Sequence, residues 1–205
     1  MTHYAMVIDL NTCVGCNACM AACAMENQTP VWKNKWRTYV PEKEIGTNEM
    51  VRRRFFPHLC NHCDNPPCLT VCPTGATYKR PDGIVMINPD LCMGCRACAM
   101  ACPYDARYEV TYGDIREGKE FYGEAELQRT SPSMDKCSFC AHRVDKGMKP
   151  ACVETCVGSA RLFGDLDNPS DPVAQIVMSG AAQPLMAHFG TRPNVYYIED
   201  MKRKG

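Results

Sequence analysis

Sixteen of the 205 residues are cysteines, and their spacing indicates metal-cluster chemistry. The most regular run places Cys92, Cys95 and Cys98 three residues apart, followed by Cys102 and then Pro103. Thiolates at this spacing bind 4Fe–4S clusters: the first three ligate one cluster, and the fourth ligates a second. The proline removes a backbone donor and restricts the turn that follows. This run therefore predicts ligands for two different clusters.

The other twelve cysteines form three further runs of four. These are Cys13, Cys16, Cys19 and Cys23; Cys60, Cys63, Cys68 and Cys72; and Cys137, Cys140, Cys152 and Cys156. The first repeats the regular spacing, the second has a wider middle gap, and the last contains a gap of eleven residues. Ala24 and Val157 stand where the other two runs have proline, a departure that leaves every ligand position filled.

Two other uses of cysteine fit this pattern less well. Disulfide scaffolds occur mainly in short secreted chains, whereas every cysteine here lies within a Cys-x-x-Cys or Cys-x-x-x-Cys step, a loop too tight for a good disulfide. Structural zinc usually takes two well-separated Cys-x-x-Cys pairs, but two of these runs have three cysteines at successive steps of three. We therefore expect four 4Fe–4S clusters, with four thiolate ligands each.

The exchange of the fourth ligand between paired runs assigns the cysteines to four sites. We expect the second and third runs to exchange ligands with each other, and the first and last runs to do the same. Site 1 then contains Cys13, Cys16, Cys19 and Cys156; site 2 contains Cys23, Cys137, Cys140 and Cys152; site 3 contains Cys60, Cys63, Cys68 and Cys102; and site 4 contains Cys72, Cys92, Cys95 and Cys98. Because such sites crosslink distant segments, we expect the metal-free chain to lack a stable fold.

The predicted fold is α+β, with two bacterial-ferredoxin-like two-cluster units, one inserted within the other, and with short strands and helices joined by long loops. Residues 58–102 form the expected inner unit, while residues 1–57 and 103–205 form the outer unit, which ends in a C-terminal extension. Residues 105–136 show no clear periodicity and are predicted to be a partner-contact insertion or a variable surface loop. The other expected elements are strands at 4–8, 50–56, 84–87, 161–167 and 195–198, with the last beside the first, and helices at 19–25 and 172–179.

Composition excludes several classes of function. Acidic and basic residues number 23 each, so the formal net charge is zero and nothing points to a nucleic-acid partner. We expect no signal peptide, and no apolar stretch approaches the roughly 18–20 residues that span a membrane. No Ser–His–acid set, phosphate loop or dinucleotide fingerprint supports catalysis by the chain itself. The expected activity is one-electron transfer, without catalysis.

Four residues near the runs have alternative roles. Trp32 and Trp36, four residues apart, either form a docking face or cluster lid or simply cover local core, and we favour the second. His62 and His142 either ligate or tune a cluster or have a hydrogen-bonding or packing role. Since the cysteines already complete four sites, we expect the second role for both histidines.

Longer motifs surround the cysteine runs. They are Cys-Asn-His-Cys-Asp-Asn-Pro-Pro-Cys at 60–68, Cys-Pro-Tyr-Asp-Ala-Arg-Tyr at 102–108, Lys-Cys-Ser-Phe-Cys-Ala-His-Arg at 136–143 and Pro-Ala-Cys-Val-Glu-Thr-Cys at 150–156. With the four runs in this order, the chain resembles the four-cluster electron-transfer (beta) subunit of molybdopterin oxidoreductases of the dimethyl sulfoxide reductase type. Within that family it looks most like the small subunits of polysulfide, thiosulfate and arsenate reductases.

This resemblance implies a complex. A large catalytic subunit would carry molybdopterin guanine dinucleotide with molybdenum or tungsten, and an integral membrane subunit would exchange electrons with quinone. Site 1 would lie nearest the catalytic subunit and site 4 nearest the membrane subunit. The resemblance also implies export with the catalytic subunit, to the periplasm or the outer face of the cytoplasmic membrane, with the cytoplasmic face as the alternative. The alternative functions are a stand-alone or hydrogenase-linked polyferredoxin and a structural zinc protein.

Overall fold

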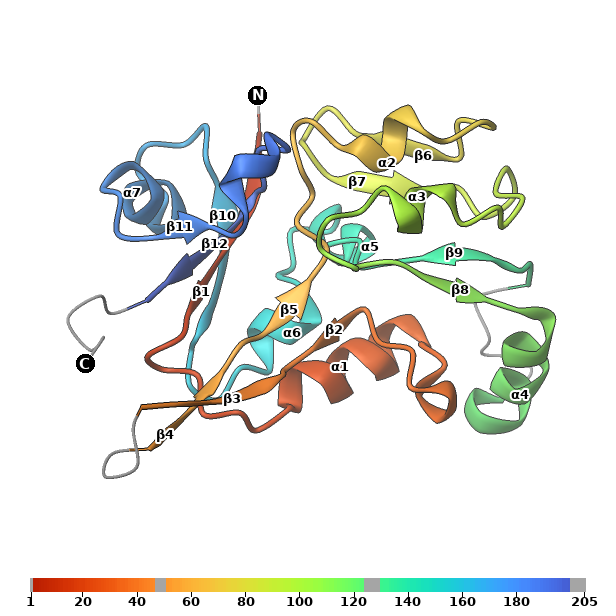
Figure 1. Cartoon of the computed structure of the whole chain (residues 1–205), viewed down its shortest axis with the longest axis horizontal. Helices are drawn as coiled ribbons and strands as arrows, with labels where there is room; N and C mark the ends of the chain where they lie inside the picture. Colours follow the sequence, from red (N-terminus) through yellow and green to blue (C-terminus); the bar gives the residue numbers. More distant parts are fainter. Residues whose placement is uncertain (1, 47–50, 124–129, 200–205) are drawn as a thin grey trace.

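The structure, a computed structural model, describes residues 2–46, 51–123 and 130–199. A sheet that contains the first and last described strands lies on one side, and short hairpins and helices with the cysteine runs lie on the other (Figure 1). The longest described helix has 11 residues. Within these residues, no helix combines the length and apolar character that a membrane crossing requires.

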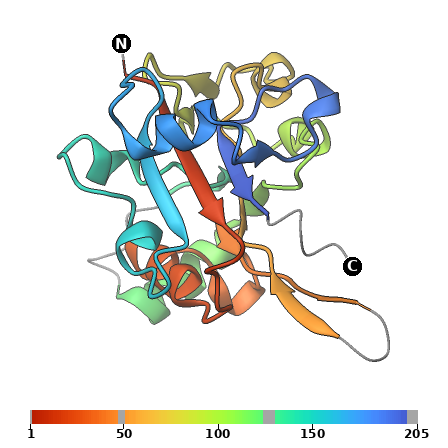
Figure 2. The ribbon, with the colours of Figure 1, turned by 90° about the vertical axis from the view of Figure 1, so that its left-hand side faces the viewer.

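A four-stranded sheet joins the two ends of the chain. Its central strand β1 (Tyr4–Asp9) pairs antiparallel with β10 (Arg161–Asp165) and parallel with β12 (Val195–Ile198). The short strand β11 (Gln183–Pro184) pairs with the other edge of β12. Figure 2 shows β1, β10 and β12 side by side. The predicted strands at 4–8 and 195–198, and their proximity, are confirmed, as is a strand within 161–167.

The two faces of β1 contribute to different cores, because successive strand residues point to opposite sides of a sheet. Met6 and Ile8 face the main core, which also contains buried cysteines of three runs. Ala5 and Val7 face a smaller core beneath α7 (Pro172–Met178), the predicted helix at 172–179. The side chain of Asp171 accepts a hydrogen bond from the Val173 amide and so caps the start of α7.

Two pairs of helices hold cysteines from distant runs against each other. Helix α1 (Ala18–Asn27) packs against α6 (Ala151–Glu154), and α2 (Pro67–Thr70) packs against α3 (Ala97–Met100). The predicted helix at 19–25 is thus confirmed as part of α1. The helix ends at Asn27, and its C-cap Gln28 has a left-handed backbone two residues before the proline expected to stop it.

Small two-stranded sheets support these helices. Their strands are β2 (Thr38–Tyr39) with β5 (His58–Leu59), β3 (Glu42–Ile45) with β4 (Arg52–Phe55), and β6 (Thr77–Lys79) with β7 (Val85–Ile87). Strands are thereby confirmed within the predicted ranges 50–56 and 84–87. Three further short helices lie elsewhere in the described chain: η1 (Val31–Lys33), α5 (Ala141–Val144) and η2 (Ala187–Phe189).

The prediction that residues 105–136 form a loop without regular structure is wrong. This segment contains β8 (Tyr108–Val110), α4 (Tyr112–Tyr122) and β9 (Ser133–Asp135), while 124–129 lie outside the described residues. Only Asp114, Ile115 and Gly118 of α4 are buried, so the helix lacks the apolar period that would indicate it in the sequence. Its start is instead stabilised by a capping box in which Asp114 replaces the usual Glu or Gln.

Helix α4 is anchored by the segment that contains both tryptophans. The Trp32 ring packs on Phe121 and Tyr122, with ring centroids 5.2 and 5.9 Å apart. Lys35 pairs with the Asp114 carboxylate at 2.6 Å. Trp32 therefore covers part of α4, while its predicted role of covering local core stays a prediction, because Phe121 is itself exposed. Trp36 donates a hydrogen bond to the Asn34 side chain at 2.7 Å.

Replacing Thr111 by alanine is expected to loosen α4, because it removes the oxygen that accepts from the Asp114 amide. Loss of such a cap costs about 1 kcal/mol, or roughly a fivefold increase in helix opening. Hydrogen-exchange mass spectrometry should show faster exchange at 112–122, and Thr130→Ala, at an exposed position, serves as the control. Unchanged exchange in α4 would show that the cap does not stabilise the helix.

Candidate metal centres

Each cysteine run curls at the residue just before its second cysteine. Gly15, His62, Gly94 and Phe139 occupy this position, and all four have positive φ, between 43° and 72°. Glycine adopts this left-handed backbone readily, whereas other residues pay roughly 1–2 kcal/mol. His62 and Phe139 are both buried and stack on each other with ring centroids 3.7 Å apart, which offsets that cost. In the first run, the three thiols around this curl line one cavity.

The two histidines near the runs have structural contacts. Nδ1 of His62 accepts a hydrogen bond from the Val85 amide at 3.1 Å. The His142 ring lies 2.7 Å from the Glu26 carboxylate. The predicted hydrogen-bonding and packing roles of both residues are confirmed.

The cysteines assigned to site 1 line one small cavity. Its wall includes all four of them: Cys13, Cys16, Cys19 and Cys156. Burial raises the pKa of Cys13, and the nearby Cys19 and Cys156 thiols add to the increase. Cys16 is exposed, so the cavity lies at the surface of the chain. Gly158 also lines it, and a Cβ atom there would meet the carbonyl oxygen of Thr12 at 2.5 Å.

The cysteines assigned to site 2 line a second cavity, deep in the chain. All four are buried: Cys23, Cys137, Cys140 and Cys152. Burial raises the pKa of Cys23 to about 12 and that of Cys152 to about 11, and holds that of Cys137 well above its usual range. The Asn27 amide lies 3.5 Å from the Cys23 sulfur and 3.8 Å from the Cys140 sulfur. Arg37 in turn donates to the Asn27 oxygen at 2.6 Å.

The cysteines assigned to site 3 lie close enough to affect one another's ionisation. Burial raises the pKa of Cys63 to about 12, and the thiols of Cys60, Cys68 and Cys102 contribute to that increase. Cys60, Cys63 and Cys68 are buried, and Cys102 is half-buried. Two residues after Cys102, the buried Tyr104 fixes the loop, because its hydroxyl lies 2.6 Å from the Thr191 hydroxyl.

The cysteines assigned to site 4 lie around α2 and α3. Cys98 and Cys92 belong to one apolar cluster with Val85 and Met134. Cys72 follows the end of α2, which packs against α3. Cys95 is exposed. Although burial opposes the change, hydrogen bonds from Thr77 and Thr74 lower the pKa of Cys72.

Backbone amides point at sulfur atoms in these runs. The distances are 3.2 Å from Ala160 N to Cys156 Sγ, and 3.4 Å from Thr77 N to Cys72 Sγ, from Met134 N to Cys92 Sγ and from Phe139 N to Cys137 Sγ. Hydrogen bonds of this kind favour the thiolate, which is the form that ligates iron. They also tune a bound cluster by withdrawing negative charge from sulfur.

The donor set fits iron–sulfur clusters. All sixteen cysteines lie in the described part of the chain, and none forms a disulfide. Among the described residues, no three Cys, His, Asp or Glu side chains converge as a single metal ion would require. Thiols that surround a cavity without meeting at one point suit a multinuclear cluster better than a mononuclear zinc. Cationic iron would also supply the positive charge needed to stabilise buried thiolates, whose formation burial opposes by raising the thiol pKa.

Sequence reasoning missed three buried cations beside these thiols: Arg107, Lys136 and Arg161, exposed by only 6%, 3% and 2%. A signal for two of them was present, because Arg107 and Arg161 each follow the last cysteine of a run by five residues. Their burial could not be read from the chain, since charged residues near turns are usually solvated.

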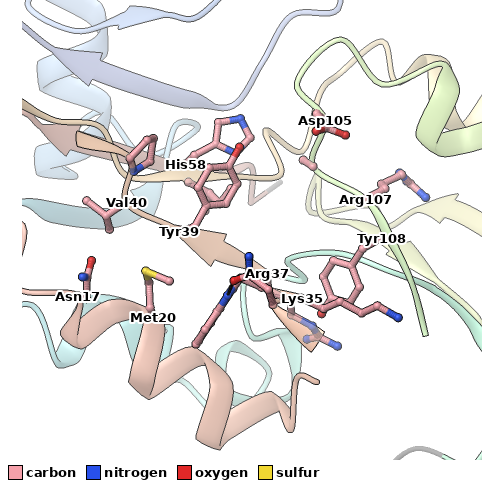
Figure 3. Close-up of a pocket in the computed structure, with 15 residues that line it drawn as sticks. Asn17, Met20, Lys35, Arg37, Tyr39, Val40, His58, Asp105, Arg107 and Tyr108 are labelled. Carbon is pink, nitrogen blue, oxygen red and sulfur yellow. Dashed lines mark hydrogen bonds between the residues drawn. The ribbon is translucent and has the colours of Figure 1, made fainter. Parts of the chain in front are cut away.

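A separate cavity of about 470 Å³ lies between α1, β2, β5 and residues 105–108, and no cysteine lines it (Figure 3). Its cationic side chains already have partners. Arg37 binds Asp135 with two nitrogens at 2.9 Å, and Arg107 donates to a cysteine sulfur at 2.9 Å. The cavity is therefore distinct from the four thiol sites and offers no free cation to an anionic ligand.

Two family models match the chain, and both describe a 4Fe-4S dicluster domain. One covers residues 51–117 and 121–166, and the other covers residues 12–76. Together they include all four cysteine runs.

Similar curated proteins are iron–sulfur subunits of reductases. The B subunit of tetrathionate reductase from Salmonella typhimurium is 42% identical over 201 residues, covering 96% of this chain and 72% of that protein. The B subunit of selenate reductase from Mesobacillus selenatarsenatis is also 42% identical, over 214 residues, with the same two coverages. The arsenate respiratory reductase iron–sulfur subunit of Shewanella sp. is 37% identical over 223 residues and covers 94% of each chain.

Removing iron anaerobically with a chelator is expected to abolish the stable fold, because sites 1 to 4 join segments that otherwise share only short strands and helices. Far-UV and near-UV circular dichroism should both lose their native signal, and reconstitution with iron and sulfide should restore it. Unchanged spectra of iron-free protein would contradict this expectation.

Proposed function

The chain belongs to the family of four-cluster iron–sulfur (beta) subunits of molybdopterin oxidoreductases, and we propose that its four sites form a line between two docking surfaces. It is an electron-transfer subunit of anaerobic respiration, with four 4Fe–4S clusters, and catalysis belongs to another subunit of its complex. Bound clusters supply reversible one-electron redox chemistry. The chain itself contributes the ligands, their order and the surfaces at which the line ends.

The proposed ligand sets are those of sites 1 to 4, with the last cysteine of each run exchanged. The two cavities support sites 1 and 2, because each is lined by three cysteines of one run and one from a run more than a hundred residues away. The effect of Cys102 on the ionisation of Cys63 supports site 3. The packing of α2 against α3 supports site 4, since these helices bring Cys72 toward Cys98.

The proposed order runs from site 1 to site 4. Cys19 of site 1 acts on the ionisation of Cys152 in site 2, and Cys60 of site 3 acts on that of Cys137 in site 2. Site 3 and site 4 meet in one apolar cluster. Short steps between neighbouring sites are what an electron relay requires.

Exposure at the two ends is the observation on which this proposal chiefly depends. Site 1 and site 4 each have one exposed cysteine, Cys16 and Cys95, whereas the cysteines of site 2 are all buried and those of site 3 are buried or half-buried. Exposed apolar side chains flank both ends. They are Val14 and Val157 beside site 1, and Leu91, Met93 and Met100 beside site 4. Apolar surface of this kind is typical of a docking face.

From the family resemblance, we assign the site 1 end to the molybdopterin catalytic subunit and the site 4 end to an integral membrane subunit that exchanges electrons with quinone. The proposed location is the outer face of the cytoplasmic membrane, after export with the catalytic subunit. The substrate is bound by that partner. By analogy with the relatives' names, we propose an oxyanion or related compound of sulfur, selenium or arsenic.

The proposed nesting has residues 58–102 as an inner unit within 1–57 and 103–205. Support comes from the two helix pairs: α1 with α6 joins the first run to the last, and α2 with α3 joins the second run to the third. The pairing of β1 with β10 and β12 also closes the outer segments on each other.

Cysteine-to-serine variants test the exchange of ligands. Cys13→Ser and Cys156→Ser are expected to alter the same signal in low-temperature EPR spectra, because both residues belong to site 1. Cys137→Ser should alter a different signal, since it belongs to site 2. If Cys156→Ser and Cys137→Ser instead affect one common signal, each run keeps its own fourth cysteine and the proposed partition is wrong.

The two docking surfaces are separable by co-purification of the tagged chain under anaerobic conditions. Val157→Glu is expected to reduce recovery of the molybdenum or tungsten subunit at least tenfold, because it places a charge in an apolar interface. Met100→Glu should reduce recovery of the membrane subunit alone, by a similar factor. Met178→Glu, at a methionine that is 75% exposed on α7, is the matched control.

The unaltered chain should arrive with both partners and about sixteen irons, as four clusters require. Recovery of a brown chain alone, without molybdenum or tungsten, would instead support a stand-alone polyferredoxin. Equal losses with all three variants would show that the two ends are not separate docking surfaces.

A further inference from the structure

Three buried cations lack a carboxylate partner among the described residues: Arg107, Lys136 and Arg161. Burying an uncompensated charge is expensive, so a protein retains one only where negative charge lies nearby. Arg37 illustrates the usual solution, since its guanidinium forms two hydrogen bonds with the Asp135 carboxylate. For the other three cations, the neighbouring groups that can carry negative charge are cysteine thiols, together with the Tyr197 hydroxyl beside Arg161.

Arg161 lies between sites 1 and 2. Its Nη2 is 3.4 Å from the sulfur of Cys19, a site 1 residue, and 2.9 Å from the Thr38 hydroxyl. Its charge and a hydrogen bond oppose the burial-induced rise in the pKa of Cys152, a site 2 residue. Nη1 is buried and has no hydrogen-bond partner within the described chain, so the guanidinium retains a free donor beside both sites.

Arg107 repeats this arrangement between sites 3 and 4. Its Nη2 is 2.9 Å from the sulfur of Cys68, a site 3 residue, and its Nη1 is 3.2 Å from the Thr77 hydroxyl. It also interacts with Cys98 of site 4. Each arginine therefore binds one threonine hydroxyl and reaches the third cysteine of two runs. Because this arginine–threonine–cysteine arrangement occurs twice, we regard it as a structural feature of each pair of cluster sites.

Lys136 occupies the remaining junction, between sites 2 and 3. Its ammonium donates to the carbonyl oxygens of Val85 and Cys137, the latter at 2.8 Å. Burial lowers the pKa of Lys136, and the thiols of Cys60 and Cys68 in site 3 and of Cys137 in site 2 oppose that change. With Arg161 and Arg107, Lys136 completes a series in which each neighbouring pair of sites has one cation between its members.

We propose that Arg161, Lys136 and Arg107 are positioning residues that place one positive charge at each junction of the line and raise the reduction potentials on both sides of it. This inference rests on the proposed order of sites 1 to 4. Net charge and hydrogen bonds to sulfur are among the factors that set the potential of an iron–sulfur cluster. Reduction adds an electron, so a nearby cation stabilises the reduced form more than the oxidised form.

Charge-removing variants of the full chain, purified anaerobically with its clusters and partners, test the proposal. Arg161→Gln is expected to lower the equilibrium constant for one-electron reduction at sites 1 and 2 about tenfold, which is about 59 mV in midpoint potential. Sites 3 and 4 should be unaffected. Lys136→Gln should shift sites 2 and 3, and Arg107→Gln should shift sites 3 and 4. EPR-monitored redox titration measures each shift, with signals assigned through the cysteine variants.

Two controls separate charge from packing. Arg161→Lys keeps the charge, so the midpoint potentials of sites 1 and 2 should stay close to those of the unaltered chain. Arg80→Gln removes an arginine that is paired with Asp82 and Asp145 at 2.8 and 2.5 Å, and it should shift no site. If one glutamine variant fails to assemble, the other two carry the same test at their own junctions.

The outcomes distinguish this inference from the function on which it rests. Four assembled clusters with unchanged midpoints, or equal shifts at all four sites, would overturn the role of the cations and leave electron transfer intact. Shifts confined to the two adjacent sites, reversed by lysine at position 161, support the proposal. A chain that does not hold four clusters would refute the proposed function first.

Discussion

In the proposed ligand sets, thiolates from distant parts of the chain bind the same iron cluster, and this is the interaction on which the rest of the structure depends. The described helices have at most 11 residues, and outside the four-stranded sheet the described strands form two-stranded sheets. Elements this short have little stability alone. The helices that carry cysteines instead pack in pairs, α1 against α6 and α2 against α3, and so bring cysteines of different runs together. Fold and electron transfer therefore share one set of residues.

Burial of the inner thiols makes their thiolate forms costly, and the groups that reduce this cost also affect the reduction potential of a bound cluster. The raised pKa values of Cys23, Cys137 and Cys152 reflect the cost of a thiolate away from water. Iron, backbone amides and buried cations each reduce that cost, and the same three factors set the potential of a cluster. The exposed ends at Cys16 and Cys95 need less compensation, because water and a partner subunit can reach them.

Cysteine spacing carried most of what could be predicted. It led to four clusters and to an α+β chain of short elements, and short apolar runs located β1, β7 and β12. Helix α4 escaped prediction because its capping box uses Asp114 and because Ile115 is the one large apolar residue that it buries, while Tyr112 and Phe121 are exposed. The left-handed backbone at His62 and Phe139 could not be foreseen either, since only their mutual stacking makes it tolerable. Burial of Lys136 likewise depends on a contact with Val85, which is distant in the sequence.

The most direct test of this account is a structure of the anaerobically purified complex, with the irons located by anomalous scattering at the iron absorption edge. We predict four separate clusters, each bound by three cysteines of one run and the last cysteine of its partner run. They should follow one another in the order of sites 1 to 4, with Arg161, Lys136 and Arg107 at the three junctions. A cluster bound by all four cysteines of a single run would contradict the account.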